Sequence, residues 1–494
     1  MLLSATAFAS SLLGLTCKLV PLVVELSKRI VAFRENPITP TATRDFEIGI
    51  RAVLQEIGRV IVEWVFNRVE PTDSAEAPQH VQFDNNIYRR RDPSPRRFGV
   101  ATLFGVIAFW RIRYEPCDEG IGLRCIFPLE ERLGLLVGKA TPALAQRLGP
   151  WAAQHTQQSV LKLLLEEHQV PWSVQKLRDM TAALSQAVTP FLHDAQVARL
   201  LELMKRAHDS TGPHLPVLVV GRDGIFLPIV NNVKYREACT ATLSVFDRNG
   251  KNLGTMYLGQ MPESGQLRLS RQLTDLILAV LRGWNGPMPR LEYVTDGGFH
   301  PTDYFESTLK TMLHPVTQLP LQWEWVIDFY HACLYITKMA DAMFGRGTKQ
   351  AATWAAKMRH WMKHKKRGVF RVLHSAAALA CRLEFTKKER ENFDVGYEYL
   401  LNRMNLMDYV DYRSRGLAIG SGITEAACKI VFTQRFKQSG MKWSLEGGQT
   451  IVDLRVIHLS GLWTAVYDAY QRSLTQLQTG TRLELNCHSY RIAA

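Results

Sequence analysis

The sequence predicts an α/β protein in which a mixed β-sheet forms the core, mainly helical N-terminal regions precede it, and an all-helical segment is inserted into it. Three observations support this prediction. Residues 216–328 contain short β-branched and apolar runs around one amphipathic helix, whereas residues 345–414 carry only helical patterns. Residues 141–209 place apolar side chains three and four positions apart, as helices do. The 494 residues leave room for roughly two to four domains.

Residues 1–97 are expected to form a helical region followed by a basic linker. Residues 45–70 have helical spacing, while residues 71–97 are polar, contain four prolines and include arginine clusters. Residues 1–17 are apolar like the core of a signal peptide, but no Lys or Arg precedes them. We expect a packed or flexible helix there, with export or membrane contact as the alternative. No other stretch is long and apolar enough to span a bilayer, so we expect a cytoplasmic protein without a membrane partner.

Residues 98–140 are predicted to be a small β-containing segment, because residues 98–114 are rich in β-branched and aromatic side chains. Residues 141–210 follow as helices that break at Gly149-Pro150 and again at residues 170–173, where Ser173 is a candidate N-cap. Short helices joined by tight turns fit a DNA-binding helix-turn-helix, and plain helical packing fits equally well.

The central pattern runs from residue 211 to residue 344. The elements expected in chain order are a strand at 216–223, a hairpin of strands 241–246 and 253–258 around the turn 247–250, a helix at 264–283, strands at 291–298 and 323–328, and a helix at 329–344. Three antiparallel strands followed by parallel strands reached through helices is the order of an RNase H-like sheet. The remaining parts are an all-helical insertion at 345–414, a second core segment at 415–480 with a helix at 423–438, and a tail at 481–494.

Two of these strands run into the same kind of turn. Asp223 is followed by a glycine and Asp296 by two glycines. In adjacent parallel strands both carboxylates would lie at the carboxyl edge of the sheet, where open α/β sheets place their sites. Two close carboxylates repel, and Mg²⁺ relieves that repulsion because it prefers oxygen ligands. The ordinary alternative is that each Asp caps a turn.

Two further positions could join such a site. Glu425 opens a helix and has no other acid near it before Glu446, which suits a metal-bound phosphate backbone; capping of the helix is the alternative. Asp328 and His331 are three residues apart and therefore share a helical face. They could pair, ligate a metal or position DNA, although an N-cap Asp with a nearby His is the more common arrangement.

Charge points to a polyanionic partner. The chain has a formal net charge of +14, and no acid occurs between Ala342 and Leu383. A solvated helical face normally mixes signs, so an unbalanced basic run favours phosphate contact. The eight cysteines include no C-x-x-C pair, and the spacing of Cys117 and Cys125 is poor for zinc, so we expect free thiols and no zinc site.

These residues together resemble a known family. Asp223-Gly, Asp296-Gly-Gly, Asp328-x-x-His331 and the block Gly420-Ser-Gly-x-Thr-Glu425-Ala-Ala-Cys-Lys429 are similar to bacterial insertion-sequence DDE transposases of the Kra type, which are related to the Mutator group. The stretch Arg435-x-Lys437-x-Ser439-Gly440-Met441-x-Trp443 matches the same family. The resemblance covers roughly residues 98–470 and is strongest over 216–460.

The resemblance implies a transposase that cleaves and transfers DNA strands with two Mg²⁺ ions, for which Mn²⁺ can substitute. Asp223, Asp296 and Glu425 would be the catalytic metal ligands, with Asp328 and His331 in support. The partners would be transposon ends and target DNA, bound by a homodimer or higher oligomer at the bacterial nucleoid. A domesticated DNA-binding protein and an RNase H-fold nuclease are the alternatives. The expected DNA contacts are Lys357, Arg359, Lys363, Lys365, Lys366, Arg367, Lys429, Arg435, Lys437 and Lys442.

Overall fold

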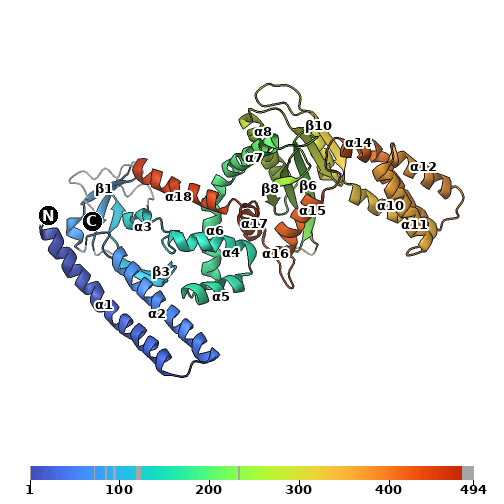
Figure 1. Cartoon of the computed structure of the whole chain (residues 1–494). Helices are drawn as coiled ribbons and strands as arrows, with labels where there is room; N and C mark the ends of the chain where they lie inside the picture. Colours follow the sequence, from blue (N-terminus) through green and yellow to red (C-terminus); the bar gives the residue numbers. More distant parts are fainter. Residues whose placement is uncertain are drawn as a thin grey trace. The chain divides into compact units, whose positions relative to one another are not determined.

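The computed structural model describes residues 2–71, 73–83, 86–92, 96–117, 124–231 and 234–480 (Figure 1). The chain forms two compact units, one made of Met1–Val188 with Tyr467–Ala494 and the other of Thr189–Val466. The protein is of the mixed α/β class, as predicted, and its largest sheet is a mixed sheet of five strands. Among the described residues, no helix combines the length and the apolar character that a membrane crossing requires. The predicted tail at 481–494 lies outside the described residues.

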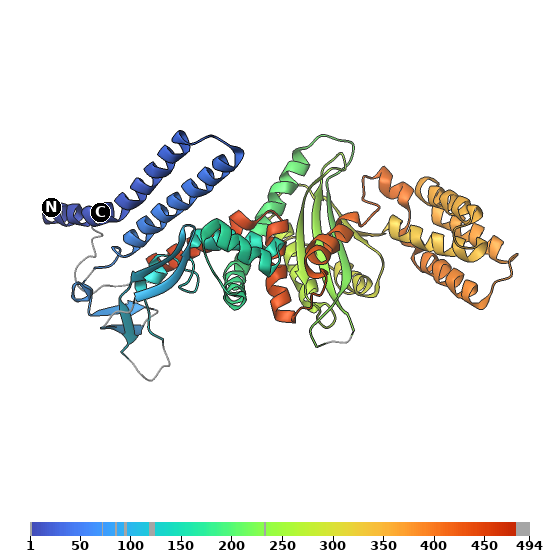
Figure 2. The same cartoon turned by 90° about the horizontal axis from the view of Figure 1, so that it is seen from below.

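The first unit begins with a helical hairpin of α1 (Leu2–Glu35) and α2 (Pro40–Phe66), which lie side by side in both views (Figures 1 and 2). The rings of Phe33 and Phe46 stack with their centroids 4.3 Å apart near the connection. Thr39 caps α2 by accepting the amide of Ala42 at 3.1 Å. The helix predicted over residues 45–70 is therefore confirmed.

The stretch 71–97, expected to be a linker, contains β1 (His80–Phe83), β2 (Asn86–Arg91) and the start of β3 (Arg96–Thr102), so that prediction is wrong. β1, β2 and β5 (Arg113–Pro116) form one sheet, and β3 pairs with β4 (Gly105–Trp110). The physical reason is a small core in which Val81, Tyr88 and Tyr114 are buried together. The Arg90 guanidinium donates to the carbonyls of Ser74 and Ala77, so this arginine closes a turn. The strands predicted within 98–114 are confirmed.

Helices complete the first unit: α3 (Pro128–Arg132), α4 (Pro142–Gln154), α5 (Gln157–His168), α6 (Val174–Val188) and most of α18 (Trp463–Gly480). The break predicted at Gly149-Pro150 is wrong, because α4 continues through Pro150 to Gln154. Leu148, Ala152 and Ala153 are buried around the proline, and this packing outweighs the missing N–H. The second predicted break is confirmed. The Ser173 hydroxyl accepts the amide of Lys176 at 3.2 Å, as expected of an N-cap.

The second unit is built on the sheet β10-β9-β6-β7-β8. Its strands are β6 (Val217–Leu227), β7 (Arg236–Phe246), β8 (Asn252–Gln260), β9 (Arg290–Thr295) and β10 (Trp323–Ile327). β6, β7 and β8 are antiparallel, and β9 and β10 add in parallel. The hairpin turn is the predicted one: Asp247 accepts the amides of Asn249 and Lys251, and Gly250 has φ +76°. The predicted order of strands is therefore confirmed.

Helices cover both faces of this sheet. Arg222 on β6 reaches Ser270 and Gln266 at α8 (Leu267–Gly283), which packs with α7 (Leu192–Asp209) on that face. The neighbouring Gly221 faces the other way, toward Thr424 of α15 (Gly422–Ala427). Beyond α15 come η6 (Cys428–Thr433, a π-helical turn), α16 (Gln434–Phe436) and α17 (Leu445–Leu459). The helix predicted at 423–438 is confirmed, with a π turn inside it.

The segment between β10 and α15 is helical, as predicted. It consists of α10 (Phe329–Phe344), α11 (Lys349–His364), α12 (Gly368–Ala380), α13 (Lys387–Arg403) and α14 (Tyr409–Ser414). Figures 1 and 2 show these helices together beyond the end of β10. Thr386 and Glu389 form a capping box that starts α13. α10 packs along α13, so the segment shares buried side chains such as Met339 and Leu400.

Candidate functional site at the carboxyl ends of the strands

Three aspartates stand in one row across β6, β9 and β10. The parallel register pairs Gly221 with Val294 and Ile327 with Thr295. Continuing it by one or two residues places Asp223 and Asp328 on either side of Asp296. Neighbouring strands are about 4.8 Å apart, so the row brings the backbones of these aspartates close together.

Asp223 does not end its strand, contrary to the prediction. β6 continues to Leu227 because β7 pairs with it along its whole length, with Asp223 opposite Thr240. The prediction placed the ends of both strands at one edge of the sheet. In the structure β9 ends there, whereas β6 extends several residues further. The carboxylate of Asp223 still lies at the level where β9 stops.

The carboxyl of Asp223 lies under η6. Its Oδ1 accepts the amide of Gly224 at 2.8 Å, and it is hydrogen-bonded to the thiol of Cys428. Burial raises the pKa of Asp223 to about 6, and the charges of Asp296 and Glu425 raise it as well, while its two hydrogen bonds oppose the shift. The pKa of Asp223 therefore depends in part on the charges of the other two predicted ligands, Asp296 and Glu425.

Helix α15 brings Glu425 to the same face of the sheet. The helix lies directly on β6, since a Cβ at Gly221 would be 1.9 Å from the Thr424 hydroxyl oxygen. That hydroxyl is 2.9 Å from the hydroxyl of Thr242 on β7. Glu425 itself is exposed. Partial burial raises the pKa of Glu425, the charges of Asp328 and Asp296 raise it further, and His331 lowers it.

The carboxylate of Asp328 is fully occupied by hydrogen bonds within the protein. It is fully buried, and its Oδ1 accepts the amides of Tyr330 at 2.5 Å and His331 at 3.1 Å. Its Oδ2 accepts the amide of Ser421 at 2.8 Å and also binds the Ser421 hydroxyl. Asp328 thus caps α10 and ties it to the glycine-rich turn before Glu425. The interpretation of Asp328 as an N-cap is confirmed, and its four bonds position the loop.

The turn at Asp296 is held by residues that the sequence did not single out. Asp296 Oδ1 accepts the amide of Gly298 at 2.8 Å. The Tyr399 hydroxyl donates to the Asp296 carbonyl at 2.6 Å, and Arg403 donates to the Gly297 carbonyl at 2.7 Å. Both come from α13, more than a hundred positions along the chain, where they resemble ordinary helical side chains.

Metal-ligating side chains are not gathered into a closed set. Among the residues that the structure describes, no three His, Cys, Asp or Glu side chains form a group that could hold a metal ion. The charges of Asp296 and Glu425 raise the pKa of Asp223, and the charge of Asp296 raises that of Glu425, each as a smaller cause than burial. Their oxygen chemistry suits Mg²⁺ or Mn²⁺. Cys117 and Cys125 are free and exposed.

The predicted DNA contacts in the helical insertion differ in exposure. Lys357, Lys365, Lys366 and Arg367 are exposed. Arg359 and Lys363 are half-buried: Arg359 donates to the hydroxyl of Thr337, and the Lys363 ammonium lies 5.3 Å from the ring of Phe329 and 6.0 Å from that of Tyr330. In the described part of the chain, none of the six forms an ion pair.

The predicted contacts after Glu425 divide in the same way. Lys429, Lys437 and Lys442 are exposed. Arg435 is only 2% exposed, with its guanidinium carbon 5.0 Å from the Trp443 ring centre, so its prediction as a DNA contact is wrong for this conformation. Burial lowers the pKa of Arg435 to about 10, and the neighbouring Arg455 lowers it as well. The aromatic residue that follows at Trp443 covers the charge.

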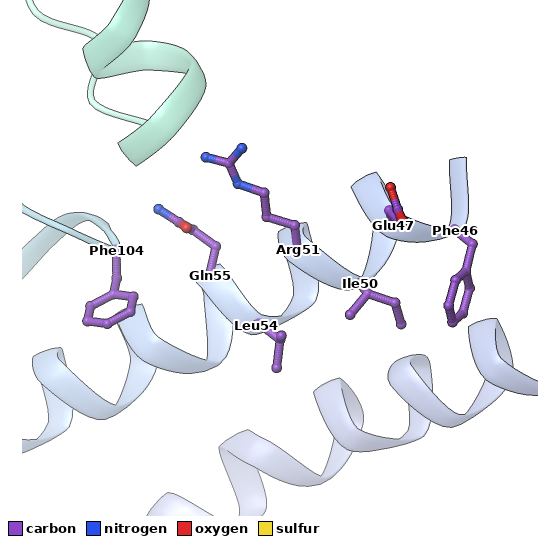
Figure 3. A pocket seen from close by; sticks show the side chains of 7 residues that line it. All are labelled: Phe46, Glu47, Ile50, Arg51, Leu54, Gln55 and Phe104. Atoms are coloured by element: carbon purple, nitrogen blue, oxygen red, sulfur yellow. The ribbon is translucent and has the colours of Figure 1, made fainter. Parts of the chain in front are cut away.

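A separate hollow lies on α2 in the first unit (Figure 3). Its lining is mostly apolar, and the Arg51 side chain at its rim pairs with Glu167 at 2.5 Å. It contains one acid and no cluster of titratable groups, so it offers no chemistry of its own. Its lining residues are Phe46, Glu47, Ile50, Arg51, Leu54, Gln55 and Phe104.

Comparison with known proteins does not assign this chain to a family. No family model matches this chain, and a search of curated proteins found no match either.

Proposed function

We propose that this protein is a DNA transposase of the DDE type, similar to the Kra-type insertion-sequence family, with a metal-dependent active site formed by Asp223, Asp296 and Glu425. One observation carries the proposal. Asp223 and Asp296 occupy the same level of adjacent parallel strands, and the helix bearing Glu425 rests on that face of the sheet, so the three charges influence one another.

The proposed core is RNase H-like. Three antiparallel strands are followed by two parallel strands that extend the sheet from β6, and helices lie on both faces. The acidic positions fall on the central strand, on its parallel neighbour and on a late helix. The helical segment between β10 and α15 separates the second carboxylate from the third, as the resemblance leads one to expect.

Mg²⁺, or Mn²⁺ in its place, would be held by the carboxylates of Asp223, Asp296 and Glu425. When bound, it would activate a water or 3′-hydroxyl and stabilise the leaving oxygen of the phosphodiester. The residues themselves supply negative charge, and none of the three carboxylates forms an ion pair in the described part of the chain. Burial and like charges raise the pKa of Asp223 to about 6, so this carboxyl is mostly ionised at pH 7 and would bind the ion as a carboxylate. Exposed Glu425 would complete the set from above the strands.

DNA would be bound by cations that form no ion pair with an acid among the described residues. Lys357, Lys365, Lys366 and Arg367 in the insertion, with Lys429, Lys437 and Lys442 after Glu425, are exposed and accessible to phosphates. We propose transposon ends and target DNA as the ligands, a homodimer or higher oligomer as the DNA-bound form, and the bacterial nucleoid as its location.

The test is cleavage of a plasmid that carries the inverted repeats flanking the gene. The expected result is cutting at the repeat ends with Mg²⁺ or Mn²⁺ and none with a chelator. Asp303→Asn, which changes an exposed acid seven residues after Asp296, is a matched control that should cut normally. Binding without metal-dependent cutting would favour a DNA-binding protein, and cutting without preference for the repeats would favour a nuclease.

A further inference from the structure

The helical insertion grips the turn that carries Asp296. Tyr399 Oη donates to the Asp296 carbonyl at 2.6 Å, and Arg403 Nη2 donates to the next carbonyl, Gly297, at 2.7 Å. Gly297 has φ +72°, and a Cβ there would lie 2.5 Å from Arg403 Nε. The left-handed turn and the close approach of the guanidinium both require glycine. Two consecutive carbonyls of the turn are thus bonded to one helix, α13.

The ring of Tyr399 is itself held by a neighbouring ring and by a guanidinium. Its ring stacks on Tyr335 of α10 with centroids 3.7 Å apart and planes 10° apart, and the Arg403 guanidinium lies 4.4 Å from the Tyr399 ring centre on α13. His331 contacts this pair, 5.5 Å from Tyr335 and 5.8 Å from Tyr399 between ring centroids. The phenol therefore has little freedom to leave the Asp296 carbonyl, and the stack ends at the His331 ring.

The neighbouring strand is tied to the insertion in the same manner. The buried Tyr409 of α14 donates its hydroxyl to the Ile327 carbonyl at 2.9 Å, one residue before Asp328. Phenol-to-carbonyl bonds from the insertion therefore reach the ends of both β9 and β10. A displacement of α13 and α14 would displace the backbone on which Asp296 and Asp328 stand.

We propose that Tyr399 and Arg403 are positioning residues that fix the Asp296–Gly297 turn, so that the helical insertion sets the position of the second carboxylate. The consequence for catalysis rests on the proposed function. The same insertion carries the exposed cations Lys365, Lys366 and Arg367, so DNA bound to them would act on the carboxylate through α13. The insertion would then be part of the active-site framework as well as a DNA surface.

The first test needs no activity. Hydrogen exchange of the peptide spanning residues 295–300 is measured in the full chain without DNA for Tyr399→Phe, Arg403→Gln and the double variant. Losing one buried hydrogen bond should raise exchange of this turn roughly five- to tenfold, and the double variant should exceed either single change. Tyr397→Phe is the control. It lies on the same helix, its ring stacks on Phe393, and its hydroxyl has no hydrogen-bond partner among the described residues, so exchange should stay at the parental value.

The second test uses DNA cleavage. Tyr399→Phe and Arg403→Gln should lower the single-turnover rate about tenfold or more while DNA affinity stays parental, and Arg403→Lys should recover part of the rate. Faster exchange of the turn with parental cleavage, in an active protein, would overturn the catalytic consequence. Unchanged exchange in the double variant, with a parental melting temperature, would overturn the positioning itself. If the parental chain cleaves no DNA, the exchange result still decides the positioning, and the proposed function fails separately.

Discussion

Two rows of acidic residues follow β9 and β10, one within the strands and one just past their ends, and the two rows differ in their partners. In the inner row Glu292 stands beside Glu324 in the parallel register. In the outer row, four residues further along each strand, Asp296 stands beside Asp328. The outer row lies one residue past the last residue of each strand, at the carboxyl edge of the sheet.

The acids of the inner row are neutralised by arginine partners at Glu324 and by protonation at Glu292. Glu324 pairs with Arg290 at 3.3 Å and with Arg415, which also reaches Asp411 at 2.7 Å. Glu292 is fully buried, and its carboxyl accepts the amide of Ala418 at 3.0 Å. Burial raises the pKa of Glu292 to about 8, and Glu324 raises it further, while the Ala418 bond and Arg415 lower it. This carboxyl is neutral at pH 7.

The outer row has no such cations. In the described part of the chain, no Lys, Arg or His forms an ion pair with Asp223, Asp296, Asp328 or Glu425. Asp328 is satisfied by four hydrogen bonds instead. The remaining negative charge belongs to Asp223, Asp296 and Glu425. Strand register alone can therefore align acidic residues. The two rows differ in whether arginines pair with the acids, and the unpaired acids are the ones available to a ligand.

The largest expected effect separates the two rows by catalysis. Asp223→Asn, Asp296→Asn or Glu425→Gln should each lower DNA cleavage by about a thousandfold or more, because under the proposed function each removes a charged metal ligand. DNA binding should be nearly unchanged. Glu292→Gln should cleave at the parental rate, because glutamine resembles the protonated carboxyl that already occupies this site. Single-turnover assays with matched binding measurements check both rows.

A parental rate in Asp223→Asn, Asp296→Asn or Glu425→Gln would remove that residue from the active site. A thousandfold loss in Glu292→Gln with an intact fold would break the distinction between the rows.

The local pattern of the sequence is what made the outer row predictable. A β-branched run that ends in Asp-Gly-Gly marks a strand and a turn, so the position of Asp296 at the end of β9 could be predicted without tertiary information. The same pattern misplaced the end of β6, which continues past Asp223 to Leu227 because β7 pairs with it. Glu425 could be singled out from the glycine-rich residues that precede it and from the absence of another acid before Glu446. The strand order followed from the alternation of strands and helices along the chain.

What the sequence could not predict depends on contacts between distant segments. Arg435 stands in a basic run, and only the packing of Trp443 over its guanidinium shows that it is buried. Tyr399 and Arg403 bond to carbonyls more than a hundred residues away. Arg90 looked like linker charge because its partners are backbone carbonyls, which leave no mark in the sequence.

The basic residues, like the acidic ones, divide into those with ion-pair partners and those without. The second prediction concerns the unpaired ones. Lys365, Lys366 and Arg367 are exposed and have no ion pair among the described residues, whereas Arg290 and Arg415 are paired. Changing these three to Ala should weaken DNA binding without altering sequence preference. The slope of log K against log salt should fall by about 0.9 for each DNA phosphate that the variant no longer neutralises. Fluorescence anisotropy over a range of salt concentrations measures it.

The matched control is Lys387→Ala with Lys388→Ala. Both lysines are exposed on α13 of the same insertion, close to Glu389 and Glu391. Their removal should leave the salt slope parental. An unchanged slope in the triple variant would place the DNA path elsewhere, with Lys429, Lys437 and Lys442 as the next positions to change.

The third prediction concerns the inner row as part of the fold. Arg415→Gln should lower the free energy of unfolding by about 1–3 kcal/mol, between the values for surface and buried ion pairs, because Arg415 and Glu324 are about a quarter exposed. Arg415→Gln with Glu324→Gln should lose less than the sum of the single changes. Denaturant unfolding measures all three, and additive losses would show that the pair is not coupled.

The smallest expected effect is a pH dependence that differs between the rows. A carboxyl whose pKa is higher in the folded state binds a proton that the unfolded chain has released, so its contribution to stability declines as pH rises between the two pKa values. For Glu292 this window runs from its ordinary pKa of 4.5 to about 8, and for Asp223 from 3.8 to about 6. Between pH 6 and pH 7 Glu292 should lower the free energy of unfolding by about 1 kcal/mol, whereas the decline from Asp223 is nearly complete and contributes much less. Glu292→Gln should lack the larger decline, whereas Asp223→Asn should keep it and lose mainly the decline at and below pH 6. Urea unfolding at pH 5, 6 and 7 tests the assignment, and equal slopes for the parental chain and Glu292→Gln would show that the inner-row carboxyl is ionised after all.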